Sequence, residues 1–192
     1  MTIVEWLATA LGIAYVLLMI RRNILSWIAG NIGVTLQAVS FYTARLYADM
    51  VLQGIYFVLG CYGFWRWWKH PQETKVSPAK RIQKWSLWGK LCGVWLFGSV
   101  VWATVLIYWT DAALPEIDAT LATASLIATW MQAQRYAENW LLWIGIDTAY
   151  ALVYWSRALY LYTFLYALFV LMAWRGWLLW NETTNEHSAT TC

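Results

Sequence analysis

Seven long apolar runs, separated by short polar segments, dominate the pattern of hydrophobic and polar positions along the chain. An α-helix rises ~1.5 Å per residue, so it needs about 20 apolar residues to cross the ~30 Å hydrocarbon core of a bilayer. Each run has about this length, and we predict helices over residues 3–20, 24–43, 47–68, 88–109, 117–134, 139–156 and 159–180. The pattern therefore indicates an all-α integral membrane protein with seven transmembrane helices.

The composition also indicates a membrane protein. Hydrophobic residues make up 61% and charged residues 12% of the 192 residues, and the mean hydropathy of +0.49 is outside the range of soluble domains. Seven spans leave no room for a soluble catalytic domain. The 17 Trp and 12 Tyr residues exceed what two interfacial belts need, so we expect some aromatic side chains inside the bundle.

The sequence carries no sign of a cofactor or metal site. The three cysteines, Cys61, Cys92 and Cys192, form no C-x-x-C pair, and their odd count favours free thiols over a disulfide framework. No G-x-x-x-x-G-K phosphate loop occurs, so the chain alone is not expected to use ATP. We expect no cofactor, no metal and no nucleic-acid partner, and the sequence leaves open whether the chain forms a homo-oligomer.

Most lysines and arginines fall in connections on one side of the predicted membrane. The longest polar segment, residues 69–84, lies on that side, together with Arg21, Arg22, Arg66, Lys90, Arg135 and Arg175. The connection that holds Asp111, Glu116 and Asp118 lies on the other side. Because cytoplasmic loops carry the excess of Lys and Arg, we expect the N-terminus outside and the C-terminus in the cytoplasm.

The chain contains an internal repeat. A shift of 113 positions superimposes, without a gap, Leu46-Tyr47 on Leu159-Tyr160, Gln53 on Tyr166, Gly63 on Gly176 and Trp67 on Trp180. Upstream, Trp27-Ile28 is matched with Trp143-Ile144, which pairs Asn31 with Asp147. We therefore predict two three-helix units of related sequence.

The fourth predicted helix sets the relative orientation of the two units. A three-helix unit crosses the membrane an odd number of times, so directly fused copies would be inverted, and one extra span restores a parallel arrangement. We expect a first repeat at residues 1–70, a basic cytoplasmic loop and linker helix at 71–110, a second repeat at 111–180 and a polar tail at 181–192. Transporters of the SWEET type have such parallel repeats, with the substrate site at the repeat interface.

The most informative polar group in the predicted spans is Asp147, which shares a helical face with Trp140 and Trp143. Positions i, i+3 and i+7 of a helix lie within roughly 60° of one another. An ionised carboxylate at mid-bilayer depth costs at least about 2.5 kcal/mol, so it should face a cavity, a partner or a ligand rather than lipid. Two indole faces beside an anionic group favour a site for an organic cation.

Further candidate ligand contacts are polar or aromatic residues of the spans, namely Gln53, Tyr56, Asn31, Tyr150 and Tyr154. Gln53 needs a polar partner in hydrocarbon, and both an interhelical hydrogen bond and a ligand contact stay open as its role. Gln37 lies roughly 120° around its helix from Asn31, and we interpret Gln37 as a helix contact.

These residues resemble the PnuC family of bacterial vitamin transporters. The resemblance is carried by Leu46-Tyr47-Ala48 followed by Gln53 and Tyr62-Gly63, and by Glu138-Asn139-Trp140-Leu141-Leu142-Trp143. Its most specific element is Trp-x-x-Trp-x-x-x-Asn/Asp, which is met by Trp140, Trp143 and Asp147. The resemblance covers residues 24–70 and 117–180.

The resemblance implies a SWEET-like fold of three, one and three helices in the bacterial inner membrane. It also implies uptake of nicotinamide riboside by facilitated diffusion, followed by trapping of the vitamin by a cytoplasmic kinase. Relatives in the family take up thiamine, so thiamine or another cationic vitamin is the alternative substrate. Asp147 would attract the pyridinium of one vitamin and the thiazolium of the other, so the choice between them stays open.

Other classes of function are less favoured by the sequence. A membrane enzyme is not expected, because His70 lies in the basic loop and His187 in the tail, outside the bundle where catalytic groups would have to meet. A proton-coupled carrier remains an alternative, since Asp147 and Asp49 are ionisable groups within spans. A receptor that docks partners through the basic loop is a third alternative, although such loops more often determine topology.

Overall fold

The computed structural model describes residues 3–71 and 79–190, and these form seven α-helices. In chain order the helices are α1 (Ile3–Ile20), α2 (Leu25–Thr43), α3 (Tyr47–Lys69), α5 (Trp85–Trp109), α6 (Pro115–Gln134), α7 (Asn139–Ser156) and α8 (Tyr160–Thr190). The predicted helices are confirmed, and the main difference is that α8 continues through the polar tail to Thr190. The reason is that an apolar run marks how far a helix lies in the membrane, not where its hydrogen bonding stops.

The outer surface of the bundle is strongly apolar. Large hydrophobic side chains are exposed on every helix, and on α5 they include Val94, Leu96, Phe97 and Val100. By length and hydropathy, α5 and the Tyr160–Glu182 part of α8 are the helices that qualify as membrane spans within the described residues. The hydropathy of the other helices is lower because they carry polar side chains, many of which face the inside of the bundle.

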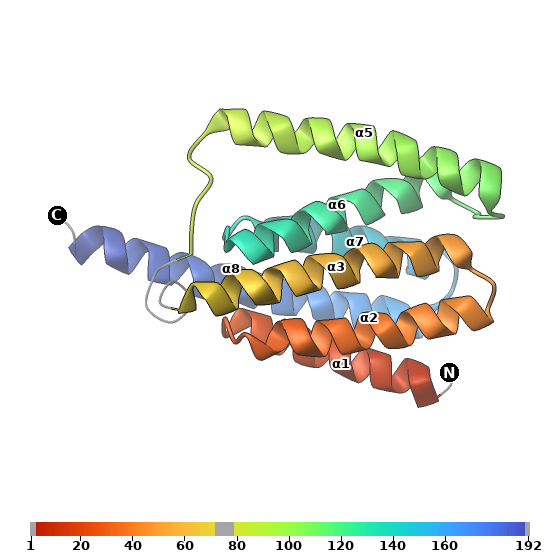
Figure 1. Ribbon diagram of the computed structural model, residues 1–192, viewed down its shortest axis with the longest axis horizontal. Coiled ribbons are helices and arrows are strands. Elements are labelled where there is room, and N and C mark those ends of the chain that lie inside the picture. The colour runs from red at the N-terminus through yellow and green to blue at the C-terminus, as the bar shows by residue number, and fades with distance from the viewer. Residues whose placement is uncertain (1–2, 72–78, 191–192) are drawn as a thin grey trace.

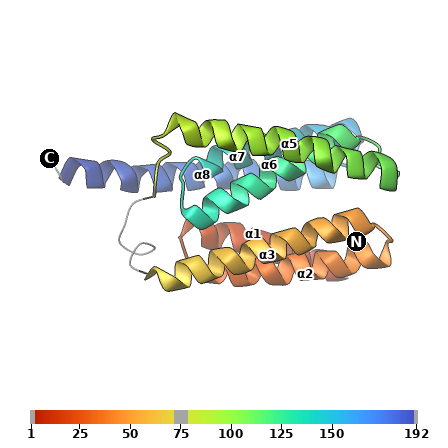
Figure 2. The ribbon, with the colours of Figure 1, turned by 45° about the horizontal axis from the view of Figure 1, so that its top comes forward.

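Six of the helices form a closed ring. Neighbouring helices contact one another in the order α1, α2, α3, α6, α7 and α8, and α8 returns to contact α1. The unit α1–α3 thus meets the unit α6–α8 along two seams, one between α3 and α6 and one between α8 and α1 (Figures 1 and 2). Helix α5 lies outside this ring and packs mainly against α6. This is the predicted arrangement of three, one and three helices.

The turns between helices fix the register of the repeat. Among the residues that the structure describes, four other than glycine have positive φ angles: Arg22 (53°), Arg45 (59°), Arg135 (64°) and Ala158 (57°). Arg22 and Arg135 follow the first helix of each unit, Arg45 and Ala158 follow the second, and both pairs are 113 positions apart. A single shift of 113 positions therefore relates the two units throughout.

This register corrects one predicted match. Trp27 is equivalent to Trp140, not to Trp143, and Asp147 is equivalent to Val34, so the predicted pairing of Asn31 with Asp147 is wrong. The mistaken match was displaced by three residues. Because a displacement of three residues is almost one helical turn, it keeps nearly the same face toward the core, and the similarity of Trp-Ile dipeptides cannot detect it.

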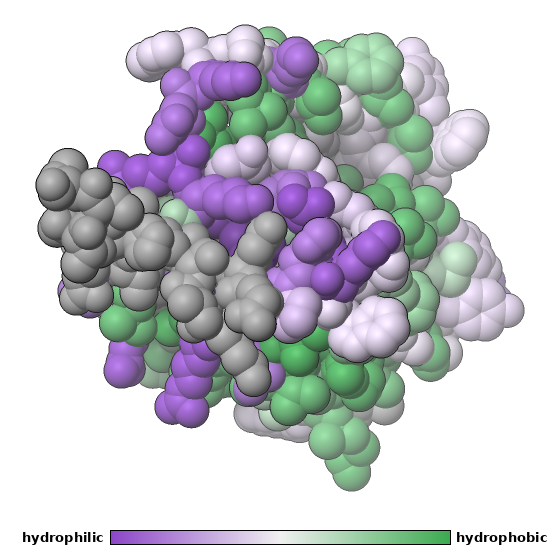
Figure 3. Space-filling view, turned by 60° about the vertical axis from the view of Figure 1, so that its left-hand side comes forward, coloured by the Kyte–Doolittle hydropathy of each residue, from purple (hydrophilic) through white to green (hydrophobic). Residues whose placement is uncertain are grey.

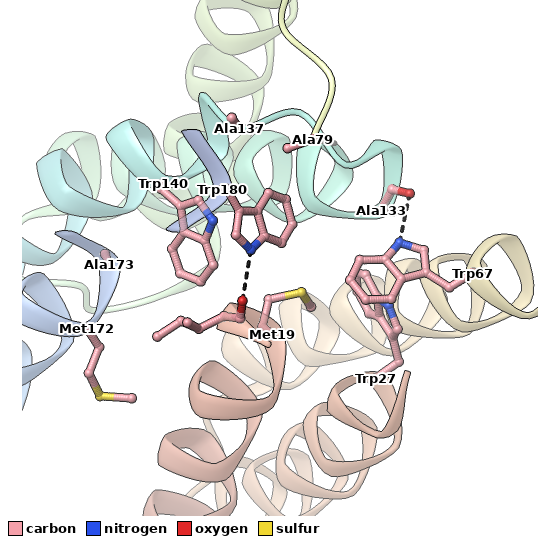
Figure 4. Close-up of a cluster of buried hydrophobic side chains, with 11 residues drawn as sticks. Met19, Trp27, Trp67, Ala79, Ala133, Ala137, Trp140, Met172, Ala173 and Trp180 are labelled. Carbon is pink, nitrogen blue, oxygen red and sulfur yellow. Dashed lines mark hydrogen bonds between the residues drawn. The ribbon is translucent and has the colours of Figure 1, made fainter. Parts of the chain in front are cut away.

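A cluster of four tryptophans, Trp27, Trp67, Trp140 and Trp180, closes one end of the ring (Figure 4). Each indole is only 1% exposed. The Trp27 and Trp67 rings meet edge to face with centroids 5.7 Å apart, and the equivalent Trp140 and Trp180 rings do so at 5.5 Å. We call this the tryptophan cluster, and the end of the bundle that carries it, with the α1–α2 and α6–α7 turns, the tryptophan end.

Two equivalent glycines make room for this cluster. A Cβ atom added at Gly63 would lie 2.5 Å from the Trp27 ring, and one added at Gly176 would lie 2.6 Å from the Trp140 ring. Such separations are shorter than van der Waals contact, and a buried indole has little space to withdraw. The repeated Gly63 and Gly176 are therefore explained by close packing of a helix against a tryptophan ring.

Substitution of Gly176 by alanine is expected to destabilise the protein. Overpacking of this kind costs about 1–3 kcal/mol, which thermal unfolding in detergent should detect as a lowered midpoint. Gly54→Ala is the matched control, because the added Cβ would meet no described atom within 4 Å, and alanine favours the helix. Equal midpoints for the two variants would contradict the packing described for Gly176.

Hydrophilic side chains gather at the tryptophan end (Figure 3). Arg66 and Lys69 lie in the last turn of α3. The segment before α5 is held against the α6–α7 turn, where the Lys80 N–H donates to the Arg135 carbonyl (2.8 Å) and the Ala137 N–H donates to the Lys80 carbonyl (2.9 Å). This basic segment and helix α5 are therefore attached to the second unit.

Candidate functional site

The ring surrounds a cavity of about 820 Å³ that also reaches the outer helix α5. Its lining extends from the tryptophan cluster, through Trp27, to the opposite end of the bundle, where Arg45, Leu46, Thr110 and Asp111 contribute. We call this opposite end, with the α2–α3, α5–α6 and α7–α8 connections, the carboxylate end. All seven described helices contribute to the lining, so the cavity lies at the interface of the two units.

Most of the predicted site residues line this one cavity. They come from α2, α3 and α7, and they are Asn31, Gln53, Tyr56, Trp143, Asp147, Tyr150 and Tyr154. The residues were grouped by helical face alone, and the fold brings the three faces together. The exception among the predicted residues is Trp140.

Trp140 lies in the tryptophan cluster and is not among the residues that line the cavity. Its ring packs on Gly176 and meets the edge of Trp180. Trp143, one turn further along α7, does line the cavity. The two tryptophans of the Trp-x-x-Trp motif therefore lie at different depths. Trp140 belongs to the tryptophan cluster, which forms the floor of the cavity, and Trp143 lines the cavity itself.

Asp147 is a buried carboxylate that faces the cavity. It lies in the middle of α7 and is 6% exposed, and among the described residues it has no hydrogen bond or ion pair with another side chain. The Trp143 ring precedes it by one helical turn, and the Trp143 Nε1–H has no hydrogen-bond partner in the described part of the chain. The Asp147 carboxylate and the Trp143 Nε1–H thus lie on one face of α7 without partners among the described residues. Because buried polar groups are normally paired, the two groups are available to bind a polar, cationic ligand.

Gln53 and Asn31 present amide groups from the first unit. Gln53 is 8% exposed and lines the cavity from α3. The Asn31 amide lies directly against Gly60 of α3, where any Cβ would collide with it, and its Nδ2 atom is 3.5 Å from the Cys61 sulfur. Gly60 is thus small because the Asn31 side chain occupies the space beside it.

A group of tyrosines forms one wall of the cavity. The Tyr150 ring lies 6.2 Å from the Tyr154 ring and 5.1 Å from the Tyr166 ring, and Tyr154 and Tyr166 are 5.3 Å apart. The site prediction did not include Tyr166 of α8. The repeat held the signal, because Tyr166 occupies the position equivalent to Gln53.

The lining is acidic. Within the described part of the chain it contains Asp49, Asp111, Asp118 and Asp147 and one basic residue, Arg45. The sequence indicates for Asp111 and Asp118 only the side of the membrane on which they lie, and it does not predict their place in the lining. Because clefts lined by one sign of charge concentrate ligands of the other sign, this cavity favours cations over anions.

Gln37 is also part of the lining, so its interpretation as a helix contact is wrong. It follows Gly30 and Val34 and precedes Phe41 along one stripe of α2, and all four residues line the cavity. The cavity extends along α2 for several turns, so it is lined by residues on both sides of Asn31. The angle between Gln37 and Asn31 around the helix axis is therefore not sufficient to decide whether Gln37 faces the cavity.

Comparisons with known proteins agree with this architecture. A family model described as nicotinamide mononucleotide transporter matches residues 2–182. The nicotinamide riboside transporter PnuC of Neisseria mucosa is 25% identical over 96% of this chain and 75% of its own length, and that of Escherichia coli K12 is 22% identical over 97% and 88%.

A solved structure shares the fold. The crystal structure of the vitamin B3 transporter PnuC matches with a TM-score of 0.76 and 25% identity, over 96% of this chain and 83% of that one. These proteins are transporters and not enzymes, which agrees with an apolar helical ring around a cavity. The chain therefore belongs to the nicotinamide mononucleotide transporter family, together with the PnuC proteins, and is an integral membrane transporter.

Proposed function

We propose that the chain carries nicotinamide riboside across the bacterial inner membrane through the cavity between its two units. The single observation that carries this proposal is the buried Asp147 carboxylate, which faces an acidic cavity without a partner among the described side chains. Nicotinamide riboside has a pyridinium ring with a fixed positive charge. The relatives named as nicotinamide riboside transporters support this vitamin over thiamine.

The cavity residues suit the parts of this vitamin. Asp147 balances the charge of the pyridinium ring, and Trp143 stacks on the ring, which as a cation–π contact is worth about 0.5–2 kcal/mol. Gln53, Asn31 and the tyrosines Tyr56, Tyr150 and Tyr154 provide hydrogen bonds for the carboxamide and the ribose hydroxyls. Trp140, which packs one turn below, acts indirectly by supporting the helix that holds Trp143.

The charge of the lining also bears on the form of the vitamin that passes. A mononucleotide carries a phosphate of about −1.5 to −2 charge at pH 7, which four carboxylates in the lining would repel. The unphosphorylated riboside is therefore the preferred substrate. The same repulsion would keep the product of a cytoplasmic kinase from returning, which explains how uptake proceeds without an energy source in the chain.

The orientation follows from the basic residues at the tryptophan end. Cytoplasmic segments of membrane proteins are enriched in Lys and Arg, and Arg66, Lys69, Lys80 and Arg81 lie at this end. The tryptophan end then faces the cytoplasm, and the N-terminus lies outside. In this orientation the described conformation has its cavity extending to the outer side and its floor toward the cytoplasm.

Flux measurements in liposomes test the transport mode. Purified protein should equilibrate labelled nicotinamide riboside across the membrane, and a pH gradient or a proton ionophore should leave the final distribution unchanged. Nicotinamide mononucleotide, offered at the same concentration, should cross much more slowly because of its phosphate. Accumulation driven by a pH gradient would instead show a proton-coupled carrier, with Asp49 and Asp147 as the candidate proton carriers. Binding without flux would favour a receptor.

A further inference from the structure

Two equivalent hydrogen bonds join the units at the tryptophan end. The Trp67 Nε1–H of α3 donates to the Ala133 carbonyl of α6 at 3.2 Å, and the Trp180 Nε1–H of α8 donates to the Ile20 carbonyl of α1 at 3.1 Å (Figure 4). The donors are 113 positions apart, and so are the acceptors. Each bond crosses one of the two seams between the units.

Other contacts between the two units accompany them, across each seam and, between α1 and α6, across the inside of the ring. The Tyr15 hydroxyl donates to Gln132 Oε1, and the Gln134 amide donates to the Tyr62 hydroxyl, both at 2.7 Å. The Arg22 guanidinium lies 5.2 Å from the centroid of the Trp180 ring. All of these residues lie on the tryptophan-end side of their helices, so this end is tightly joined between the units.

The other two tryptophans of the cluster behave differently. The Trp27 and Trp140 Nε1 atoms are buried and have no hydrogen-bond partner among the described residues. A buried donor without a partner opposes the closed arrangement, because it would regain hydrogen bonds if water entered. The cluster thus contains two N–H groups that favour closure and two that favour opening, which suits an element that must adopt two states of similar energy.

We propose that Trp67 and Trp180 are the two latches of a gate at the tryptophan end. Both hydrogen bonds are intact in the described conformation, in which the cavity reaches the carboxylate end and the tryptophan cluster forms its floor. Passage of a substrate to the other side requires the seams between α3 and α6 and between α8 and α1 to part at this end. Separation of α3 from α6 breaks the Trp67 hydrogen bond, and separation of α8 from α1 breaks the Trp180 hydrogen bond. This inference depends on the chain being a transporter and not on the identity of its substrate.

The test uses a cysteine in the cavity close to the gate. Ala29 lines the cavity two residues after Trp27 of the tryptophan cluster, and Ala29→Cys is introduced after the native cysteines have been replaced by alanine. A membrane-impermeant maleimide is then applied to right-side-out and to inside-out vesicles. The ratio of the two labelling rates reports which end of the cavity is open.

Trp67→Phe and Trp180→Phe should each shift this ratio ~2–10-fold toward labelling from the tryptophan end, as expected for the loss of one net hydrogen bond. The double variant should shift it further. Trp27→Phe is the matched control: it removes similar ring volume from the same cluster, but no bond between the units, so the ratio should stay the same or move the other way.

The proposal is overturned if Trp67→Phe and Trp180→Phe label like Trp27→Phe. Should the phenylalanine variants fail to fold, replacement of Trp67 by β-naphthylalanine keeps a two-ring side chain and removes only the N–H. That variant should shift the ratio in the same direction, and an unchanged ratio would overturn the proposal. Because labelling needs no substrate, the outcome is separate from the test of nicotinamide riboside transport.

Discussion

Asp147→Asn is expected to weaken nicotinamide riboside binding about 100-fold, the largest effect of any single substitution in the cavity. The change keeps the shape of the side chain and removes its charge. Two opposite unit charges about 6 Å apart attract each other by about 2.8 kcal/mol at an effective dielectric constant of about 20, and the low exposure of Asp147 limits screening by water. About 2.8 kcal/mol corresponds to a 100-fold change in the dissociation constant.

The same substitution should leave the fold intact. Asp147 has no ion-pair partner among the described residues, so removal of its charge deprives no cation of a counter-ion. We expect the thermal midpoint of Asp147→Asn in detergent to equal or exceed that of the wild type. Asp111→Asn is the matched control, because Asp111 is exposed at the carboxylate end and its effect on binding should be small. Equal losses of affinity in both variants would show a general charge effect rather than a site at Asp147.

Trp143→Ala is expected to weaken binding about 30-fold. The substitution removes the cation–π contact, worth up to about 2 kcal/mol in a desolvated site, together with the apolar area of the ring. Calorimetric titration of the purified variant with nicotinamide riboside measures this loss. Trp143→Phe, which keeps an aromatic face, should recover a large part of the affinity.

Trp155→Ala provides the control for Trp143→Ala. Trp155 belongs to the same helix, but its side chain is 63% exposed and does not line the cavity. We expect the Trp155→Ala variant to bind nicotinamide riboside with the affinity of the wild type. If Trp143→Ala also binds like the wild type, the ring is not part of the site.

The fold was predictable because the bilayer imposes a length on each span. The apolar runs predict six helices to within three residues at either end, and α8 begins one residue after its predicted start. Its continuation to Thr190 was not predictable from hydropathy, since the polar residues beyond the membrane still form helix. The register of the repeat is determined from the turns between helices. There Arg22 and Arg135 share a positive φ angle, which no pattern of apolar residues encodes.

The sequence predicts which helical face carries the site residues, but not how far along the helix axis the cavity extends. Trp140 and Trp143 share a face of α7, yet one packs under the floor of the cavity and the other lines it. A helical projection gives the angle of a residue and contains no information on where along the axis a cavity ends. The same limit hid Asp118, which lines the cavity toward its carboxylate end, whereas Gln37 was missed because its angle was measured from Asn31 alone.

The central claim is that Asp147 holds the positive charge of the substrate. It is tested most directly by calorimetric titration of the wild type and of Asp147→Asn with nicotinamide riboside and with its reduced dihydro form, which has the same carboxamide and ribose but an uncharged ring. We expect the wild type to bind the charged form at least ~10-fold more tightly, a difference of about 1.4 kcal/mol, and Asp147→Asn to lose this preference. Equal affinity of the wild type for the two forms would contradict the claim.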